Sequence, residues 1–314
     1  MEGVRALAVR TGETRGAWLE ALRARLGRAG IAPGDAAVEA EAILCHALQL
    51  GRAEFWCDPG APLTPEALRA VEQLAARREQ RVPLQLLLGS VGFHEVTLAV
   101  EPGVFIPRPE TETLVESVLE QVAAVGPRAG RGPEGKLIDL GTGTGAAAIA
   151  LLAALPGWTA VAIDRSPAAV ALSRRNAALN GVAARFTAVE GDYVAASAGA
   201  WLERAPYDFV IANPPYIPSG AIGELQPEVR DHDPREALDG GPDGLDAYRA
   251  LARLLPTLLR REGHLAVEIG EDQADSVRGI LAPGDPEAFR GIAMMCDLAG
   301  RPRVLRTTWR GGVA

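Results

Sequence analysis

Four consecutive residues, Asn213-Pro214-Pro215-Tyr216, have the types needed to hold a planar nitrogen group for reaction. Consecutive prolines fix the backbone and lack N–H donors, so the Asn213 side-chain oxygen and the Pro214 carbonyl are left as hydrogen-bond acceptors. Two acceptors can bind both N–H bonds of an amide or exocyclic amine and aim its nitrogen at an electrophile, while Tyr216 stacks on the planar group. A stiffened turn accounts for a bare Pro-Pro, but poorly for all four residues after an apolar strand.

A second motif, Asp139–Ala146, reads Asp-Leu-Gly-Thr-Gly-Thr-Gly-Ala and predicts a nucleoside cofactor. Its glycines permit a tight turn from strand to helix and let a ligand lie against the backbone. Asp164 ends the next expected strand, where a carboxylate can bind both hydroxyls of a ribose. The Gly-x-Gly-x-x-Ala spacing also fits a dinucleotide, so NAD is an alternative. Asp139, placed to meet the amino-acid end of a cofactor, and the third glycine, Gly145, favour S-adenosylmethionine.

Both motifs lie in a region where short apolar runs alternate with helical segments. Such alternation predicts an α/β fold with a doubly wound sheet, whose ligands bind at the carboxyl ends of the strands. The expected helices of this region span 111–125, 146–155, 167–180 and 245–261. The expected strands span 137–140, 160–163, 185–189, 209–212, 265–269, 292–296 and 304–308.

The first 80 residues differ in character, because apolar residues recur there at helical spacing. Helices are expected at 15–28, 37–50 and 64–78, without any catalytic constellation. The domains predicted are therefore a helical recognition domain at 1–82, a β-hairpin linker at 83–108 and a catalytic domain at 109–314. Within the last, 126–135 is a Gly/Pro/Arg-rich loop that we interpret as a solvated insertion.

The net charge of the chain argues against one class of function, the binding of nucleic acid. The 314 residues include 32 Lys+Arg and 40 Asp+Glu, which gives a net charge of −8. Residues 1–90 hold 11 acids and 11 arginines, so the whole excess lies in 91–314. Proteins that grip nucleic acid by neutralising phosphates usually have a basic excess, so no direct nucleic-acid requirement is expected.

Location and metal content can be predicted from the same composition. The longest apolar run, 146–155, is too short to span a bilayer, and the N-terminus has no apolar signal segment, so no membrane association is expected. Three scattered cysteines without a Cys-x-x-Cys pair predict a cytoplasmic protein with neither a disulfide framework nor a metal site.

Taken together, the motifs resemble those of the PrmC (HemK) family of protein-glutamine N5-methyltransferases, which modify the Gly-Gly-Gln loop of peptide-chain release factors. The resemblance covers nearly the whole chain and rests on Phe105-Ile106-Pro107-Arg108-Pro109-Glu110-Thr111-Glu112, on Asp139–Gly145 and on Asn213–Tyr216. It implies a Rossmann-like class I S-adenosylmethionine-dependent methyltransferase with a seven-stranded sheet, a small N-terminal helical bundle and a β-hairpin linker. A monomer acting on release factors is expected.

The resemblance also implies roles for individual residues. The glutamine amide is held by Asn213 through Tyr216, and Phe105, Arg108 and the segment up to Glu112 line the pocket wall. The cofactor is contacted by Asp139, Gly141, Thr142, Gly143, Thr144, Gly145, Asp164, Asp192, Tyr193 and Asn213. Tyr193 stands where some members have tryptophan, and Val82-Pro83-Leu84-Gln85-Leu86 has leucine where the family often has tyrosine.

Two other substrates remain open from the sequence: a ribosomal-protein glutamine and a nucleic-acid adenine amine, which the same four-residue motif serves. Several charged residues have ordinary explanations. Glu110 and Glu112 open a helix, where the helix dipole favours acids. The segment 231–233 is expected to be a solvated loop near the substrate entrance, and Glu268 ends a strand that can face the cleft.

Overall fold

The computed structural model describes residues 14–125, 134–195, 199, 201–281 and 288–311. The chain divides into two compact units, residues 1–89 and 90–314. No helix in these described stretches is long and apolar enough to cross a membrane.

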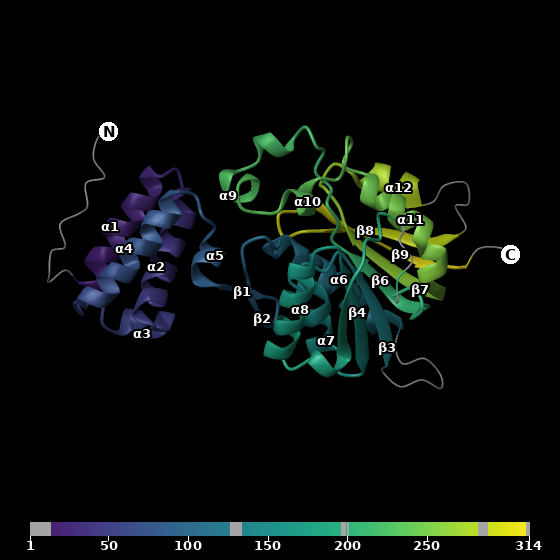
Figure 1. Ribbon diagram of the computed structural model, residues 1–314, viewed down its shortest axis with the longest axis horizontal. Helices are drawn as coiled ribbons and strands as arrows, with labels where there is room; N and C mark the ends of the chain where they lie inside the picture. Colours follow the sequence, from purple (N-terminus) through teal and green to yellow (C-terminus); the bar gives the residue numbers. More distant parts are fainter. Residues whose placement is uncertain (1–13, 126–133, 196–198, 200, 282–287, 312–314) are drawn as a thin grey trace. The chain divides into compact units, whose positions relative to one another are not determined.

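The first unit consists of helices α1 (Arg15–Arg28), α2 (Pro33–Leu48), α3 (Arg52–Cys57), α4 (Pro65–Glu79) and α5 (Leu84–Leu88). The three predicted helices correspond to α1, α2 and α4 (Figure 1). Their buried apolar stripes form one core, which includes Trp18, Leu22, Leu26, Ile43, Leu44, Phe55, Leu68 and Val71. The short helix α5 occupies residues assigned above to the linker, and the unit ends at Gly89 with a left-handed φ of 73°.

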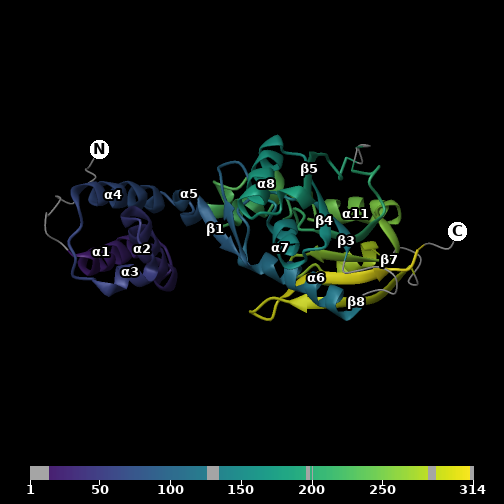
Figure 2. The same cartoon turned by 90° about the horizontal axis from the view of Figure 1, so that it is seen from below.

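The second unit is built on a seven-stranded sheet, which confirms the predicted doubly wound α/β class. Its order is β5-β4-β3-β6-β7-β9-β8, and Figure 2 shows the labelled strands running from β5 at one edge to β8 at the other. All neighbours are parallel except the pairs made by β9. The strands are β3 (Gly135–Leu140), β4 (Trp158–Asp164), β5 (Phe186–Glu190), β6 (Tyr207–Ala212), β7 (Leu259–Glu268), β8 (Phe289–Cys296) and β9 (Pro302–Trp309).

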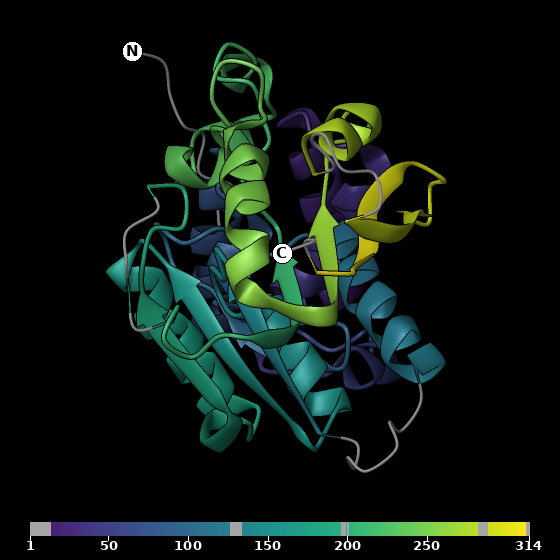
Figure 3. The same ribbon diagram turned by 90° about the vertical axis from the view of Figure 1, so that its right-hand side faces the viewer.

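Helices cover both faces of this sheet (Figures 1 and 3). One apolar core joins a face of the sheet to α6 (Glu112–Val125), α7 (Ala146–Ala154) and α8 (Pro167–Leu179). The other core joins the opposite face to α11 (Asp246–Leu258) and α12 (Ala274–Leu281). Helix α12 and the short segments η1 (Pro109–Thr111), η2 (Ala183–Arg185), η3 (Ile222–Glu224), α9 (Pro227–Arg230) and α10 (Arg235–Leu238) were not among the predicted elements.

A two-stranded hairpin, β1 (Ser90–Phe93) and β2 (Val96–Ala99), belongs to the second unit. Asn176 of α8 accepts a hydrogen bond from the Ala99 amide at 2.8 Å, and its Nδ2 donates to the Thr144 carbonyl at 2.9 Å. The hairpin is thereby tied to the loop that follows β3. Of the insertion expected at 126–135, residues 126–133 lie outside the described residues, and Gly135 begins β3.

Candidate active site

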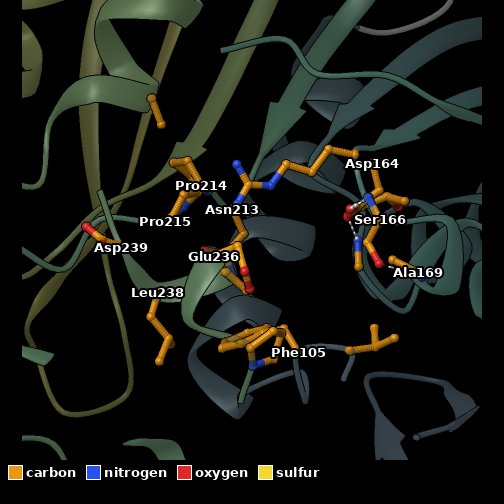
Figure 4. A pocket seen from close by; sticks show the side chains of 18 of the residues that line it. Phe105, Asp164, Ser166, Ala169, Asn213, Pro214, Pro215, Glu236, Leu238 and Asp239 are labelled. Carbon is orange, nitrogen blue, oxygen red and sulfur yellow. Dashed lines mark hydrogen bonds between the residues drawn. The ribbon is translucent and has the colours of Figure 1, made fainter. Parts of the chain in front are cut away.

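A cavity of about 1020 Å³ lies at the carboxyl ends of β3, β4 and β6, where the order of the sheet changes direction along the chain. In Figure 4, Asn213 and the two prolines face Asp164 and Ser166 across this cavity, with Phe105 at a third side. The predicted residues that line it are Phe105, Arg108, Asp139, Gly141, Thr142, Gly143, Thr144, Asp164, Asp192, Tyr193, Asn213, Pro214, Pro215 and Tyr216. Gly145, Glu110 and Glu112 are not among its lining residues.

The loop after β3 has the backbone that its glycines permit. Gly141, Gly143 and Gly145 all have positive φ, at 78°, 56° and 85°. The amides of Gly141 and Thr142 both donate to the Ile163 carbonyl at 2.9 Å, which fastens the turn to β4. A Cβ on Gly143 would meet nothing within 4 Å, so this part of the loop is open to the cavity.

Asp139 is buried beneath the loop, with 3% of its surface exposed. The Thr142 hydroxyl donates to it at 2.6 Å, and the Ala148 amide at the start of α7 donates as well. Burial raises the pKa of this carboxyl to about 7, against these two hydrogen bonds, which lower it. Asp139 therefore organises the glycine loop after β3 from inside as well as lining the cavity.

Asp164 ends β4, and both of its carboxylate oxygens are held by backbone amides. Gly143 donates to one oxygen at 2.8 Å and Ser166 to the other at 2.9 Å. Burial raises the pKa of Asp164, while these hydrogen bonds act in the opposite direction. A carboxylate oxygen has two lone pairs, so each retains an acceptor position for a ribose hydroxyl.

Tyr193 provides an apolar wall on the same side. Its side chain is 6% exposed, and its buried hydroxyl has no hydrogen-bond partner among the described residues. Burial raises the pKa of the Tyr193 phenol above its ordinary value. The preceding Asp192 accepts hydrogen bonds from the Val194 and Ala195 amides, which shapes the turn after β5. The open glycine loop, the ribose-type carboxylate and this ring fit S-adenosylmethionine.

The Asn213–Tyr216 segment leaves β6 on the other side of the cavity. Asn213 donates from Nδ2 to the Thr111 hydroxyl at 3.0 Å. Its Oδ1 and the Pro214 carbonyl make no hydrogen bond to any described residue. The Tyr216 carbonyl accepts from Gln273 at 3.0 Å, and burial raises the pKa of the Tyr216 phenol to about 12. The cavity thus contains two adjacent acceptors on a stiff backbone.

Arg108 and Asp233 correct one expectation, because the 231–233 segment is not wholly solvated. The Asp233 side chain is fully buried and forms an ion pair with Arg108. Its other oxygen accepts from the Ile106 amide at 3.2 Å, and the Arg108 guanidinium lies 5.2 Å from the centre of the Phe105 ring. The sequence gives no sign of this ion pair, because its two residues lie 125 positions apart.

Two more polar residues lie behind Asn213–Tyr216, and neither of them has an individual role predicted from the sequence. Thr111 is 4% exposed and lines the cavity, and Glu268 is 2% exposed at the end of β7. The sequence placed Thr111 in the segment expected to line the pocket wall, and it showed that Glu268 ends an apolar strand. Glu112 has a structural contact instead, since it accepts from the His94 amide at 2.9 Å.

The chain is similar to known methyltransferases. A model of the PrmC N-terminal domain matches residues 17–89, and a model of the methyltransferase small domain matches residues 96–224. A release factor glutamine methyltransferase of Rhodospirillum rubrum is 40% identical over 291 residues, which cover 93% of this chain and 82% of that protein. One of Mycolicibacterium smegmatis is 42% identical over 292 residues, which cover 92% and 96%.

A solved structure, the release factor-specific protein-(glutamine-N5) methyltransferase of Alicyclobacillus acidocaldarius, is also similar. It is 28% identical, the match covers 66% of this chain and 95% of that one, and the TM-score is 0.40. The family assignment rests on the sequence relatives, which span nearly the whole chain at 40% identity or more. By that similarity, the chain belongs to the release factor glutamine methyltransferase family.

Proposed function

We propose that the protein transfers a methyl group from S-adenosylmethionine to the side-chain amide nitrogen, N5, of the glutamine in the Gly-Gly-Gln motif of peptide-chain release factors. The observation that carries the proposal is the pair of unengaged acceptors, Asn213 Oδ1 and the Pro214 carbonyl, across the cavity from Asp164. Relatives with this activity in their names support the choice of substrate.

The residues of the chain act by orientation and electrostatics. When bound, S-adenosylmethionine supplies an electrophilic methyl group on a sulfonium and leaves as S-adenosylhomocysteine. Its holders are the glycine loop, Asp164 and Tyr193. Asn213 and Pro214 each accept one N–H of the glutamine amide, which turns the nitrogen toward the cofactor side. Both oxygens stabilise the positive charge that develops on nitrogen, and one N–H proton then passes to water.

An adenine amine presents the same two N–H bonds, so a nucleic-acid substrate is the competing function. The charge of the chain argues against it, because the second unit holds the whole acidic excess. A ribosomal-protein glutamine is the nearer alternative, and only the substrate separates it. We further propose that the 1–82 region recognises the release factor and that the enzyme acts as a monomer in the cytoplasm.

Mass spectrometry of the substrate tests the proposal directly. A purified release factor incubated with enzyme and S-adenosylmethionine is expected to gain one methyl group on its Gly-Gly-Gln peptide. Asn213→Ala is expected to lower transfer by about 10²–10³-fold, the cost of losing a positioned acceptor in the transition state. Its affinity for S-adenosylhomocysteine by titration calorimetry should stay within about threefold of wild type, because the glycine loop, Asp164 and Tyr193, which hold most of the cofactor, lie at the ends of β3, β4 and β5.

A matched control is Asn180→Ala. Asn180 follows the last residue of α8, and its side chain is hydrogen-bonded to the backbone of Thr97 in the hairpin. This variant should retain transfer. Methylation of ribosomal RNA, DNA or a ribosomal protein in place of the release factor would refute the proposed substrate. Equal losses of cofactor affinity and rate in Asn213→Ala would refute the assigned role.

A further inference from the structure

Three polar side chains, those of Asn213, Thr111 and Glu268, are connected by hydrogen bonds and form a row that runs inward from the Asn213–Tyr216 segment. Asn213 Nδ2 donates to the Thr111 hydroxyl at 3.0 Å, and the Thr111 hydroxyl is hydrogen-bonded to the Glu268 carboxyl. Thr111 and Glu268 are 4% and 2% exposed, so the row runs from the cavity wall into the core. The second carboxyl oxygen, Glu268 Oε2, is buried and has no partner among the described residues.

The fold brings these residues together from three separate elements. Asn213 follows β6 directly, and Glu268 is the last residue of β7. The two strands are parallel neighbours with Ala212 beside Val267, so the next residues on each strand lie side by side. Thr111 closes the row from η1 at the base of α6. Nothing within one segment of the sequence could have indicated this arrangement.

The direction of the hydrogen bonds in the row follows from counting hydrogens. A threonine hydroxyl has one hydrogen to donate, and an ionised carboxylate only accepts. If Thr111 donates to Glu268, its oxygen can only accept from its other neighbour. That neighbour must then present an N–H, which fixes the amide of Asn213 with Nδ2 inward and Oδ1 toward the cavity.

We propose that Glu268 is a positioning residue that acts through Thr111 to hold the Asn213 amide in the orientation that accepts the substrate N–H. The inference rests on the proposed function, since it explains how that acceptor is set. An inverted amide would present two N–H donors to a substrate that also has only donors there. Such a pair cannot bond, so the orientation decides whether the site can bind a planar –NH₂ group.

The charge state of Glu268 gives the row its direction. A protonated carboxyl can donate to Thr111, whose hydroxyl is then free to donate to Oδ1 of an inverted Asn213 amide. Burial raises the pKa of Glu268 to about 7, with Glu110 raising it further, while Thr111 and Arg303 lower it. The phenols of Tyr216 and Tyr248 also face Glu268, and both are neutral in this range because burial raises their pKa values. The productive orientation is therefore expected to be lost as the pH falls through about 7.

Nuclear magnetic resonance of the Asn213 side-chain amide tests the row without requiring transfer. The signal is assigned in the S-adenosylhomocysteine complex by its disappearance in Asn213→Ala. In wild type we expect one amide proton to be protected from exchange, and the signal to shift with a midpoint near pH 7. Thr111→Val should remove the protection, and Glu268→Gln should remove the pH-dependent shift.

Kinetics with the release factor provide the second measurement. Thr111→Val and Glu268→Gln should each lower kcat about 10–100-fold, the cost of a lost charge-assisted hydrogen bond, with calorimetric affinity for S-adenosylhomocysteine unchanged. Thr111→Ser keeps the hydroxyl and should recover kcat to within about threefold of wild type. The fall of kcat below about pH 7 should be absent in Glu268→Gln.

Thr307→Val is the matched control, because Thr307 is 1% exposed and donates to the Arg290 carbonyl on the distant β8–β9 pair. It loses a buried hydroxyl without touching the site and should leave kcat unchanged. The positioning role would be overturned if Thr111→Val kept the wild-type kcat. It would also be overturned if the Asn213 amide signal changed neither with pH nor in Glu268→Gln. Absence of transfer by the wild-type enzyme together with the expected amide signals would refute the substrate and leave the row supported.

Discussion

At the scale of single residues, the site depends on buried carboxyls that sit at the ends of parallel strands. Asp139 at β3 and Glu268 at β7 both have a pKa raised to about 7 by burial. Each is hydrogen-bonded to a threonine hydroxyl, Thr142 or Thr111. Perturbed carboxyls of this kind cluster at functional sites, because they hold ligand-facing groups in one orientation at a cost in stability.

Because burying the Asp139 carboxylate lowers the stability of the folded protein, Asp139→Asn is expected to raise that stability by an amount that depends on pH. Between about pH 4 and 7 the folded protein retains a proton that the unfolded chain has lost, so wild-type stability falls as the pH rises through this window. Asparagine removes the buried charge and still accepts from Thr142. The variant should melt about 5 °C above wild type at pH 8 and converge with it near pH 4.

Differential scanning calorimetry of the cofactor-free proteins between pH 4 and 8 measures these melting temperatures. Asp243→Asn is the control of opposite sign, because the side-chain hydrogen bond from Arg249 lowers the pKa of the exposed Asp243. It should give no gain at pH 8. A difference between Asp139→Asn and wild type that stays constant from pH 4 to 8 would contradict a buried ionised carboxyl.

At the scale of elements, the turn from β3 into α7 positions the glycine loop that lines the cavity. Gly145 precedes α7 with a φ of 85°, and a Cβ there would lie 2.7 Å from Ile149 Cδ1 and 3.1 Å from Ser173 Cβ. The residue therefore serves the packing of α7 against α8, although it does not line the cavity. Asn176 of α8 joins the same loop to the hairpin, so three elements share one anchor.

Gly145→Ala is expected to lower the free energy of unfolding by about 1–3 kcal/mol, because it adds both a left-handed backbone penalty and a core overlap. Gly279→Ala in α12 is the matched control, since its Cβ would meet nothing within 4 Å. That change should be neutral or stabilise by about 0.5–1 kcal/mol through helix propensity. Urea unfolding compares the two, and equal effects would show that the packing at Gly145 is not decisive.

At the scale of the whole molecule, the two units differ in net charge. The first 90 residues are balanced, and the remaining 224 carry the net −8. The first unit has one apolar core, and the second has one on each face of its sheet. A partner bound as a protein loop in the cavity needs shape and hydrogen bonds more than charge neutralisation.

Substrate affinity should accordingly depend little on salt. Between 50 and 200 mM salt, the KM for the release factor is expected to change by less than about tenfold. A protein that binds nucleic acid through 6–10 phosphate contacts would lose about 10³–10⁵-fold in affinity over the same range. Titration of KM against salt concentration, with cofactor affinity followed in parallel, makes the measurement. A steep slope confined to KM would favour the nucleic-acid alternative.

The sequence by itself determined the parts of this protein that depend on neighbouring residues. The strand–glycine–helix turn at Asp139–Gly145 and the acceptor segment at Asn213–Tyr216 were readable, because proline and glycine constrain the backbone locally. The strands and main helices were predicted within about four residues, since their apolar periodicity is a local property. The exception is β7, which begins at Leu259, six residues before the expected strand, and takes the last three residues of the helix expected at 245–261. Short elements such as α5 and α12 were missed, because so few turns leave little periodicity to detect.

Only the tertiary structure decided which distant side chains meet. The pairing of Arg108 with Asp233, the burial of Tyr193 and the row from Asn213 through Thr111 to Glu268 all join separate segments. Their identities as ordinary polar residues say nothing of their partners. The physical reason is that strand register sets these contacts, and register is fixed by the packing of the entire sheet against its helices.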